Sequence, residues 1–246
     1  MRVVRQVLIG ALVQDHSHFA VRWMAPMSQM PLFADAHDTV LVDDALGRIV
    51  YMPGVVPAEI ARAWFAELRE GVPWKAQRRR MYDRDVDVPR LVAHFWLAPE
   101  EGGVPDAIRA VARKVMAITG APYTSVGLNL YRDGRDSVAA HNNGLDEIVD
   151  GSPIALLSLG AIRRMTIRTK KLPRRVMHID LAAGSLLVMS YETQLHYTHG
   201  IPKTRELVGP RISLAFRVKP ARERADHHPG GDAAGKDEAG WPAATS

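Results

Sequence analysis

A series of short apolar runs between residues 125 and 218 limits most strongly what this chain of 246 residues can fold into. Each run has the length of a β-strand, and turn residues such as Asp133-Gly134 and Ala183-Gly184 lie between them. The runs are 126–131, 154–159, 165–168, 185–189 and 212–216. This pattern is typical of an antiparallel sandwich or barrel, so we predict a mainly β core here.

Two segments before this series have helical periodicity instead. Residues 57–68 begin with Pro57 and are followed by Gly71, and residues 105–119 are followed by Gly120, which are common start and stop signals. The side chains predicted to share a buried face are Ile60, Trp64 and Leu68 in the first segment, and Ile108, Val111, Val115 and Ile118 in the second. We therefore expect two amphipathic helices packed against the β core.

Composition divides the chain into three parts. Residues 1–40 lack periodicity and are predicted to be a poorly structured extension, residues 41–220 a single domain, and residues 221–246, rich in Ala, Gly, Pro and charge, a disordered tail. The N-terminal run MRVVRQVLIGALV resembles a signal peptide, but no small-residue cleavage site follows it. We expect a cytoplasmic monomer without a membrane span. A translation start at Met27 or Met30 is an alternative interpretation of the first residues.

Charge and cysteine content narrow the chemistry. With 32 basic and 27 acidic side chains the net charge is +5, which permits a polyanionic partner without requiring one. Cysteine is absent, which excludes disulfides, thiolate metal sites and cysteine nucleophiles. Any metal must therefore be bound by histidine and oxygen donors.

Two pairs of polar residues lie on strand faces that would otherwise be apolar. Arg211 and Arg217 are six residues apart in the last run, so in a strand they point to the same side. Two guanidinium groups among apolar neighbours require an anion, and a dicarboxylate would pair with both. Asn129 and Tyr131 share a face of another predicted strand.

Six motifs then occur in order over 89 residues. They are Asn129 to Asp136, His141, Ser158-Leu159-Gly160, Gly184 to Met189, His199 to Lys203 and Pro210 to Arg217. In this order the chain resembles the AlkB family of Fe(II)- and 2-oxoglutarate-dependent dioxygenases, which oxidatively dealkylate nucleic acids. The resemblance implies an α+β, mainly β fold: a double-stranded β-helix (jelly-roll) core with helices flanking one sheet.

The resemblance also implies roles for single residues. It assigns His141, Asn143 and His199 to the catalytic metal site, Arg211 and Tyr131 to the distal carboxylate of 2-oxoglutarate, and Asn129 and Arg217 to the end of the cosubstrate that chelates the metal. The expected cofactors are Fe(II) and 2-oxoglutarate.

Asn143 departs from the family pattern, which has an aspartate at this position. A neutral amide oxygen should hold Fe(II) less tightly than a carboxylate. Asp146 or Glu147 could substitute if the loop differs, and Leu145 stands where base-repairing relatives often carry an acidic residue.

Two hypotheses follow. The first is a dioxygenase that demethylates alkylated bases, with activity put in doubt by Asn143. The second is a catalytically inactive relative that binds nucleic acid or 2-oxoglutarate.

Two basic segments suit a nucleic-acid partner, in the form of alkylated single-stranded DNA or RNA. Residues 74–90 combine six basic and two aromatic side chains, and the family resemblance implies a substrate lid here, with Trp74, Arg80, Tyr82 and Arg90 as candidate contacts. The alternative is a solvated hairpin whose arginines pair with nearby aspartates. Residues 163–175 hold seven basic residues and no acid, and could contact phosphates.

Overall fold

The computed structural model describes residues 37–81, 84–98 and 102–220, without the side chains of residues 79–81 and 84–86. The predicted tail and nearly all of the predicted extension lie outside this range. The first strand begins at Thr39, just inside the predicted extension. None of the described helices is long and apolar enough to cross a membrane.

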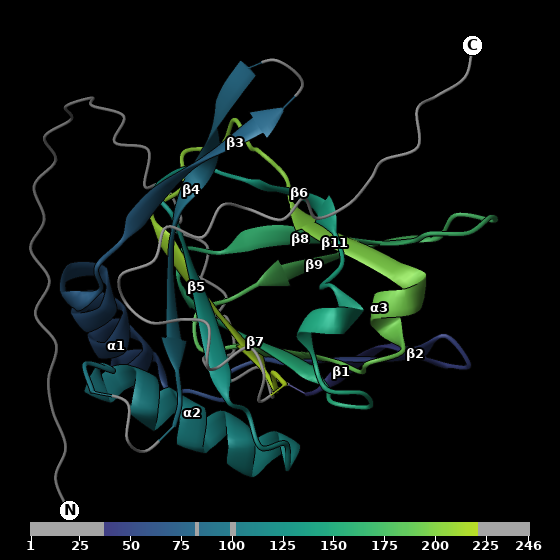
Figure 1. Ribbon diagram of the computed structural model, residues 1–246, viewed down its shortest axis with the longest axis horizontal. Coiled ribbons are helices and arrows are strands. Elements are labelled where there is room, and N and C mark those ends of the chain that lie inside the picture. Colours follow the sequence, from purple (N-terminus) through teal and green to yellow (C-terminus); the bar gives the residue numbers. More distant parts are fainter. Residues whose placement is uncertain (1–36, 82–83, 99–101, 221–246) are drawn as a thin grey trace, which may run out of the picture. The chain divides into compact units, whose positions relative to one another are not determined.

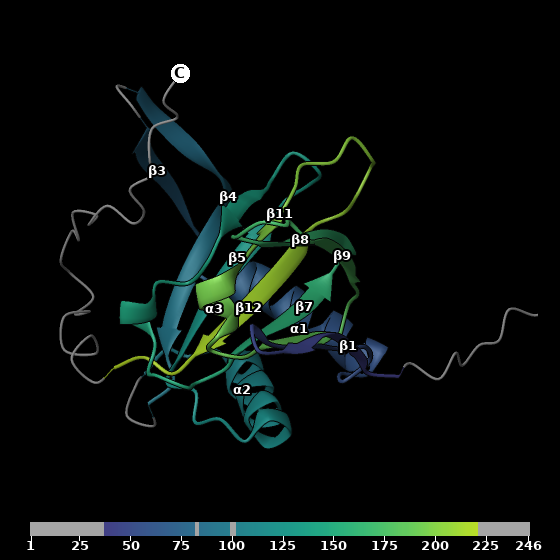
Figure 2. The ribbon, with the colours of Figure 1, turned by 90° about the vertical axis from the view of Figure 1, so that its right-hand side faces the viewer.

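Two antiparallel sheets form the described part of the chain (Figures 1 and 2). The larger sheet has the order β1 (Thr39–Asp44), β2 (Gly47–Met52), β10 (Leu186–Met189), β7 (Ile154–Gly160), β12 (Arg211–Arg217), β5 (Ser125–Tyr131), β4 (Arg84–Trp96) and β3 (Lys75–Met81). The smaller sheet has the order β6 (Val138–His141), β11 (Tyr197–Ile201), β8 (Arg163–Thr169) and β9 (Val176–Leu181). All five predicted runs are strands of these sheets. The predicted mainly β fold is confirmed.

Helices α1 (Ala58–Gly71) and α2 (Asp106–Thr119) pack together on the outer face of the larger sheet (Figure 1). The remaining helical turns are α3 (Thr193–His196) and the 3-10 turn η1 (Leu145–Glu147). Helix α2 ends at Gly120, whose φ of +69° is a left-handed conformation that glycine adopts without strain, as predicted. The helices therefore flank one sheet, as the fold prediction required.

The predicted buried faces of both helices need correction at one residue each. Ile60 is 43% exposed and Ile118 is 39% exposed. In α1 the buried side chains are Ala61 and Leu68, so the contact stripe is rotated by about one residue from the predicted one.

Strand β12 contributes side chains to the hydrophobic core on one face and to a cavity on the other. Its apolar residues Ile212, Leu214 and Phe216 pack in the cluster beneath the helices. The alternate side chains, from Arg211 to Arg217, point between the two sheets because successive strand residues face opposite sides. The predicted common face of the two arginines is confirmed.

Candidate active site

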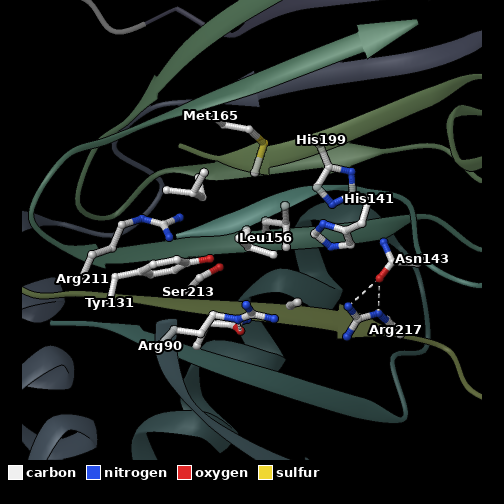
Figure 3. A pocket seen from close by; sticks show the side chains of 14 residues that line it. Arg90, Tyr131, His141, Asn143, Leu156, Met165, His199, Arg211, Ser213 and Arg217 are labelled. Atoms are coloured by element: carbon white, nitrogen blue, oxygen red, sulfur yellow. Dashed lines mark hydrogen bonds between the residues drawn. The ribbon is translucent and has the colours of Figure 1, made fainter. Parts of the chain in front are cut away.

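A cavity of about 140 Å³ lies between the two sheets (Figure 3). Its wall includes side chains from β5 and β12 of the larger sheet and from β6, β8 and β11 of the smaller one. The lining residues include three arginines, Arg90, Arg211 and Arg217, and no Asp or Glu. A small cavity with this charge is suited to a compact anion that carries more than one negative charge.

Arg211 occupies one end of the cavity and is 1% exposed. Its Nη2 donates to Ser158 Oγ at 2.8 Å, while Nε and Nη1 have no hydrogen-bond partner among the described residues. Burial lowers the pKa of Arg211, yet a guanidinium remains charged at any physiological pH. Buried donors without partners are rare and energetically unfavourable, so this end of the cavity is built to receive an acceptor. The distal carboxylate of 2-oxoglutarate fits these donors.

Tyr131 lies beside Arg211 and keeps its proton. The guanidinium carbon of Arg211 is 5.3 Å from the centre of the Tyr131 ring, and burial raises the pKa of the phenol. A neutral phenol can donate a hydrogen bond to a carboxylate bound between the two side chains. This placement agrees with the role that the family resemblance implies.

Arg163 does not belong to a phosphate-binding surface, contrary to one interpretation of the 163–175 segment. Its side chain is buried, and its nitrogens donate to the backbone carbonyls of Asp133, Asp136 and Pro202 at 2.7 to 2.9 Å. Burial is the main reason that its pKa is lowered. Alternate side chains of β8 are buried, so Arg163 points inward together with Met165 and Ile167. A count of basic residues in the segment does not distinguish these inward positions from the exposed ones.

Arg90 lines the cavity as well, instead of extending from the β3–β4 hairpin toward solvent. Its Nε donates to Asn129 Oδ1 at 2.7 Å, and its Nη1 to the carbonyl of Ser137 at 3.4 Å. The Asn129 side chain is thereby oriented with its oxygen toward Arg90. The structure brings both residues into the same cavity as Tyr131 and Arg211, although the sequence suggested separate roles for them.

His141 and His199 face each other across β6 and β11 at the other end of the cavity. Their ring centres are 4.6 Å apart. The close approach of these strands depends on Gly200, because a Cβ there would lie 2.8 Å from the carbonyl oxygen of Val138. The topology therefore brings together two imidazoles that are 58 residues apart in the sequence.

Both imidazoles are prepared to act as metal ligands. The Nδ1 atom of His141 lies 2.9 Å from the carbonyl oxygen of Ala139, and since a carbonyl only accepts, Nδ1 carries the proton and Nε2 the lone pair. Burial is the main reason that the pKa of His199 lies well below its ordinary value, and the charge of Arg217 acts in the same direction. A neutral imidazole is the form that binds a metal ion.

Asn143 supplies the third donor position and is buried in the same cavity. Its Oδ1 accepts two hydrogen bonds from Arg217, at 2.7 Å from Nε and 2.5 Å from Nη2 (Figure 3). Two imidazoles and one oxygen fit Fe(II) in kind, but the set lacks a negative charge, and both lone pairs of the amide oxygen are used by Arg217. Coordination through this oxygen therefore requires loss of at least one of the two hydrogen bonds.

The neighbouring carboxylates do not replace the missing one in this structure. Asp146 and Glu147 lie in the short turn η1, neither lines the cavity, and Glu147 is 3.8 Å from Lys219 Nζ. In the described part of the chain, no group of three His, Asp or Glu side chains is arranged to hold a metal ion. Leu145 packs against the core between the sheets.

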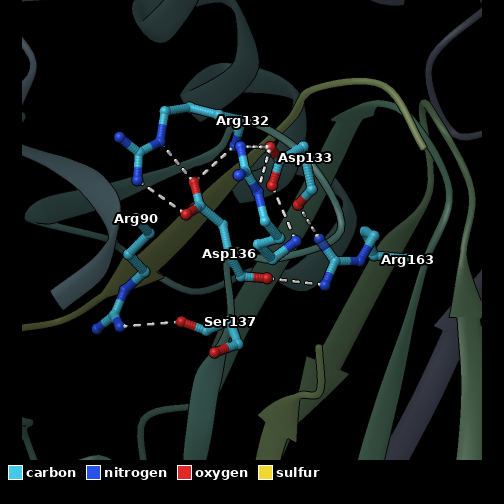
Figure 4. Close-up of polar contacts among 7 residues, drawn as sticks. Arg90, Arg132, Asp133, Asp136, Ser137 and Arg163 are labelled. Atoms are coloured by element: carbon cyan, nitrogen blue, oxygen red, sulfur yellow. Dashed lines mark hydrogen bonds and ion pairs between the residues drawn. The ribbon is translucent and has the colours of Figure 1, made fainter. Parts of the chain in front are cut away.

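A polar network stiffens the loop that connects β5 to β6 and so supports His141 (Figure 4). The buried Asp136 accepts hydrogen bonds of 2.8 Å from Arg132 Nε and Nη2, and a third from the Arg132 backbone. Burial raises the pKa of Asp136, but the hydrogen bonds and charge of Arg132 outweigh it, so the net shift is downward. Sequence reasoning missed the supporting roles of Asp136, Ser158, Arg163 and Gln194, because each depends on partners that are distant or in loops.

Of the remaining substrate candidates, Trp74 is described by the structure and does not line this cavity. Trp74 packs against the hydrophobic cluster beneath α1 and α2, and its Nε1 donates to the Arg69 carbonyl at 3.1 Å. Tyr82 and the side chain of Arg80 lie outside the described residues. In the hairpin, Arg78 pairs with Asp87 at 2.8 Å, which agrees with the alternative of local ion pairs.

The fold and the site together define a jelly-roll oxygenase with a pair of histidines and an arginine-lined cosubstrate cavity. The model of the 2OG-Fe(II) oxygenase superfamily matches residues 48–217, and the chain belongs to this superfamily. Its cofactors are Fe(II) and 2-oxoglutarate. Similarity to ALKBH2 and alkB homolog 3 proteins confirms the resemblance to the AlkB family.

The curated relatives are dioxygenases and DNA demethylases of the AlkB family. The chain is 36% identical over 125 residues to the DNA oxidative demethylase ALKBH2 of Bos taurus, covering 48% of this chain and 45% of that protein. It is 28% identical over 200 residues to the human alpha-ketoglutarate-dependent dioxygenase alkB homolog 3, covering 74% and 70%. The chain thus spans about half the length of the ALKBH2 relatives that it matches.

A solved structure supports the fold alone. The structure of OsALKBH1 superposes with a TM-score of 0.50 at 12% identity, covering 69% of this chain and 97% of that one.

Proposed function

We propose that this protein is an Fe(II)- and 2-oxoglutarate-dependent dioxygenase that oxidatively demethylates alkylated bases in nucleic acid. The observation that carries the proposal is the pair of partnerless donors on the buried Arg211, in one cavity with His141 and His199. The similarity to demethylases of the AlkB family supports the reaction class. A nucleic-acid substrate agrees with the net charge of +5.

Each cavity residue has a defined task in this reaction. Arg211 and Tyr131 would bind the distal carboxylate of 2-oxoglutarate, and the imidazoles of His141 and His199 would hold the metal. Arg90 and Asn129 form one wall of the cosubstrate site, and the hydrogen bond between their side chains holds that wall in one arrangement. When bound, Fe(II) and 2-oxoglutarate would activate O2, which is the oxidant for both 2-oxoglutarate and the methyl group. The apolar wall formed by Leu156, Met165 and Ile201 limits access of water.

The direct test measures succinate and formaldehyde released from 2-oxoglutarate and a methylated single-stranded oligonucleotide. We expect release that requires Fe(II) and the methylated base, and that is lost in the Arg211→Met variant. An unmethylated oligonucleotide of the same sequence serves as the substrate control. Succinate formation that is never stimulated by any methylated oligonucleotide would contradict the proposed substrate.

The second candidate function is a binding protein of the same fold without turnover. It is favoured by one observation, the commitment of the Asn143 oxygen to Arg217. Binding of 2-oxoglutarate and oligonucleotide with no product from this chain, together with product from the Asn143→Asp variant, would favour this candidate.

The cellular setting is also a proposal. We propose that the protein is a cytoplasmic monomer. Fractionation of cells that express the full chain and light scattering of the purified protein test the two parts separately.

A further inference from the structure

Asn143 is held by hydrogen bonds on both sides of its amide group. Its Oδ1 accepts from Arg217, and its Nδ2 donates to Gln194 Oε1 at 3.2 Å. The same Gln194 oxygen accepts from the Asn143 backbone nitrogen at 3.0 Å. Asn143 is 7% exposed and Gln194 is 1% exposed, so water does not replace these partners readily.

The direction of this chain of hydrogen bonds is fixed at both ends. At one end the guanidinium of Arg217 can only donate. At the other end Gln194 Nε2 donates to Thr193 Oγ1 at 3.0 Å, and Thr193 Oγ1 donates to the Ser190 carbonyl at 2.6 Å, which can only accept. Each amide between these ends therefore has a single orientation in which every hydrogen bond is made.

A carboxylate at position 143 would break this chain. It has no donor to offer Gln194 Oε1, so two acceptor oxygens would face each other at the 3.2 Å separation now bridged by a hydrogen bond. Rotation of the Gln194 amide would remove that repulsion, but it would also take the acceptor away from the backbone nitrogen of residue 143. Either arrangement leaves a buried polar group without a partner.

We propose that Gln194 is a positioning residue that selects an amide over a carboxylate at position 143. Asn143 is then a built feature of this site, joined to Arg217 and Gln194, and the third donor position of the metal site is neutral by construction. Gly127 contributes to the arrangement, because a Cβ there would lie 3.2 Å from Arg217 Nη1. This inference does not depend on the proposed reaction, since its first test needs neither iron, 2-oxoglutarate nor nucleic acid.

A double-mutant cycle in folding stability tests the proposal. The full chain, Asn143→Asp, Gln194→Ala and the double variant are unfolded in urea without metal. We expect Asn143→Asp to weaken folding about 10-fold more in the Gln194 background than in the Gln194→Ala background, since only the former holds the opposed acceptor. The new attraction between Asp and Arg217 is present in both backgrounds and cancels in the comparison.

The controls decide how each outcome is read. The exposed Gln77 provides a matched Gln→Ala change, which should be additive with Asn143→Asp. Additivity of Gln194→Ala with Asn143→Asp would overturn the proposal, as would failure of Asn143→Asp to fold in both backgrounds. Folding of the double variant where Asn143→Asp alone does not fold would support it.

A spectroscopic readout separates positioning from simple packing. Co(II) is titrated into the same variants and its absorption bands followed. We expect Gln194→Ala to tighten Co(II) binding several-fold in the Asn143→Asp background, because the carboxylate is freed from an opposing acceptor. The variant Gln194→Met keeps the volume of the side chain but removes the acceptor, and should produce the same gain. A gain from Gln194→Ala that Gln194→Met does not share would overturn the positioning role.

Discussion

The two ends of the cavity differ in how their polar groups are satisfied. At the Arg211 end, two buried guanidinium nitrogens have no partner among the described residues, and the Arg211 side chain lines the cavity. At the Asn143 end, the amide oxygen, the amide nitrogen and the backbone nitrogen are all paired with Arg217 or Gln194. The first end is incomplete without a ligand, whereas the second is complete within the chain.

The largest expected effect concerns the incomplete end. Replacing Arg211 with Met should weaken 2-oxoglutarate binding about 100-fold or more, because charged hydrogen bonds to a carboxylate are lost. The unliganded protein should not become less stable, since the variant also removes a buried charge with partnerless donors. Calorimetric titration and urea denaturation measure the two quantities. Arg168→Met, at an exposed position of β8, is the matched control. Unchanged 2-oxoglutarate binding by Arg211→Met would show that the Arg211 end of the cavity does not need a ligand.

The next effect compares donors at the metal end. His199→Ala should weaken Co(II) binding about 100-fold, as expected for loss of an imidazole ligand. Asn143→Ala should weaken it by no more than about tenfold, because a neutral oxygen already shared with Arg217 contributes only a single weak contact. Both are measured by Co(II) titration. Equal losses of Co(II) affinity in the two variants would mean that Asn143 is a full metal ligand. The Asn143 end of the cavity would then depend on a bound ligand, as the Arg211 end does.

A smaller effect concerns the loop that supports His141. Asp136→Asn should lower the free energy of unfolding by about 1–2 kcal/mol at neutral pH, a value reduced by the exposure of Arg132. The pKa of Asp136 is lowered in the folded chain, so its contribution is present above the ordinary value of about 3.9 and is lost as the pH falls through the lowered one. The difference between the two proteins should therefore shrink below about pH 4.

Urea denaturation at pH 7 and at acid pH measures this difference. Asp146→Asn, at an exposed position, is the control and should show little effect at either pH. A stability difference for Asp136→Asn that is constant over the whole range would show that the ionised form of Asp136 is not what stabilises the loop.

The smallest effect concerns the basic segment 163–175, which forms β8 and the turn that leads to β9. Arg168 and Arg174 are exposed, whereas Arg164 forms an ion pair of 2.8 Å with Asp180. Replacing Arg168 or Arg174 with Ala should reduce the salt dependence of single-stranded oligonucleotide binding by about 0.7 in log–log slope if each contacts one phosphate. Arg164→Ala should change it less. Fluorescence anisotropy at several salt concentrations is the measurement, and identical slopes for all variants would exclude this surface as a phosphate contact.

Much of the fold and part of the site could be predicted from sequence. Strand alternation is local, so it placed Arg211 with Arg217, and Asn129 with Tyr131, on common faces before the sheets were known. The end of α2 at Gly120 could also be predicted, because a glycine that ends a helix acts locally. The buried stripe of α1 was misplaced at Ile60, because which side of a helix packs depends on a sheet elsewhere in the chain.

The sequence by itself determined the superfamily, the jelly-roll core, the histidine pair and the replacement of a carboxylate by Asn143. Only the tertiary structure showed that Arg163 is a buried support, that Arg90 enters the cavity and that Asn143 lies between Arg217 and Gln194. The physical reason is that residue type and strand period are properties of a segment, whereas the direction of a hydrogen bond depends on both partners. In this site those partners are up to 74 residues apart.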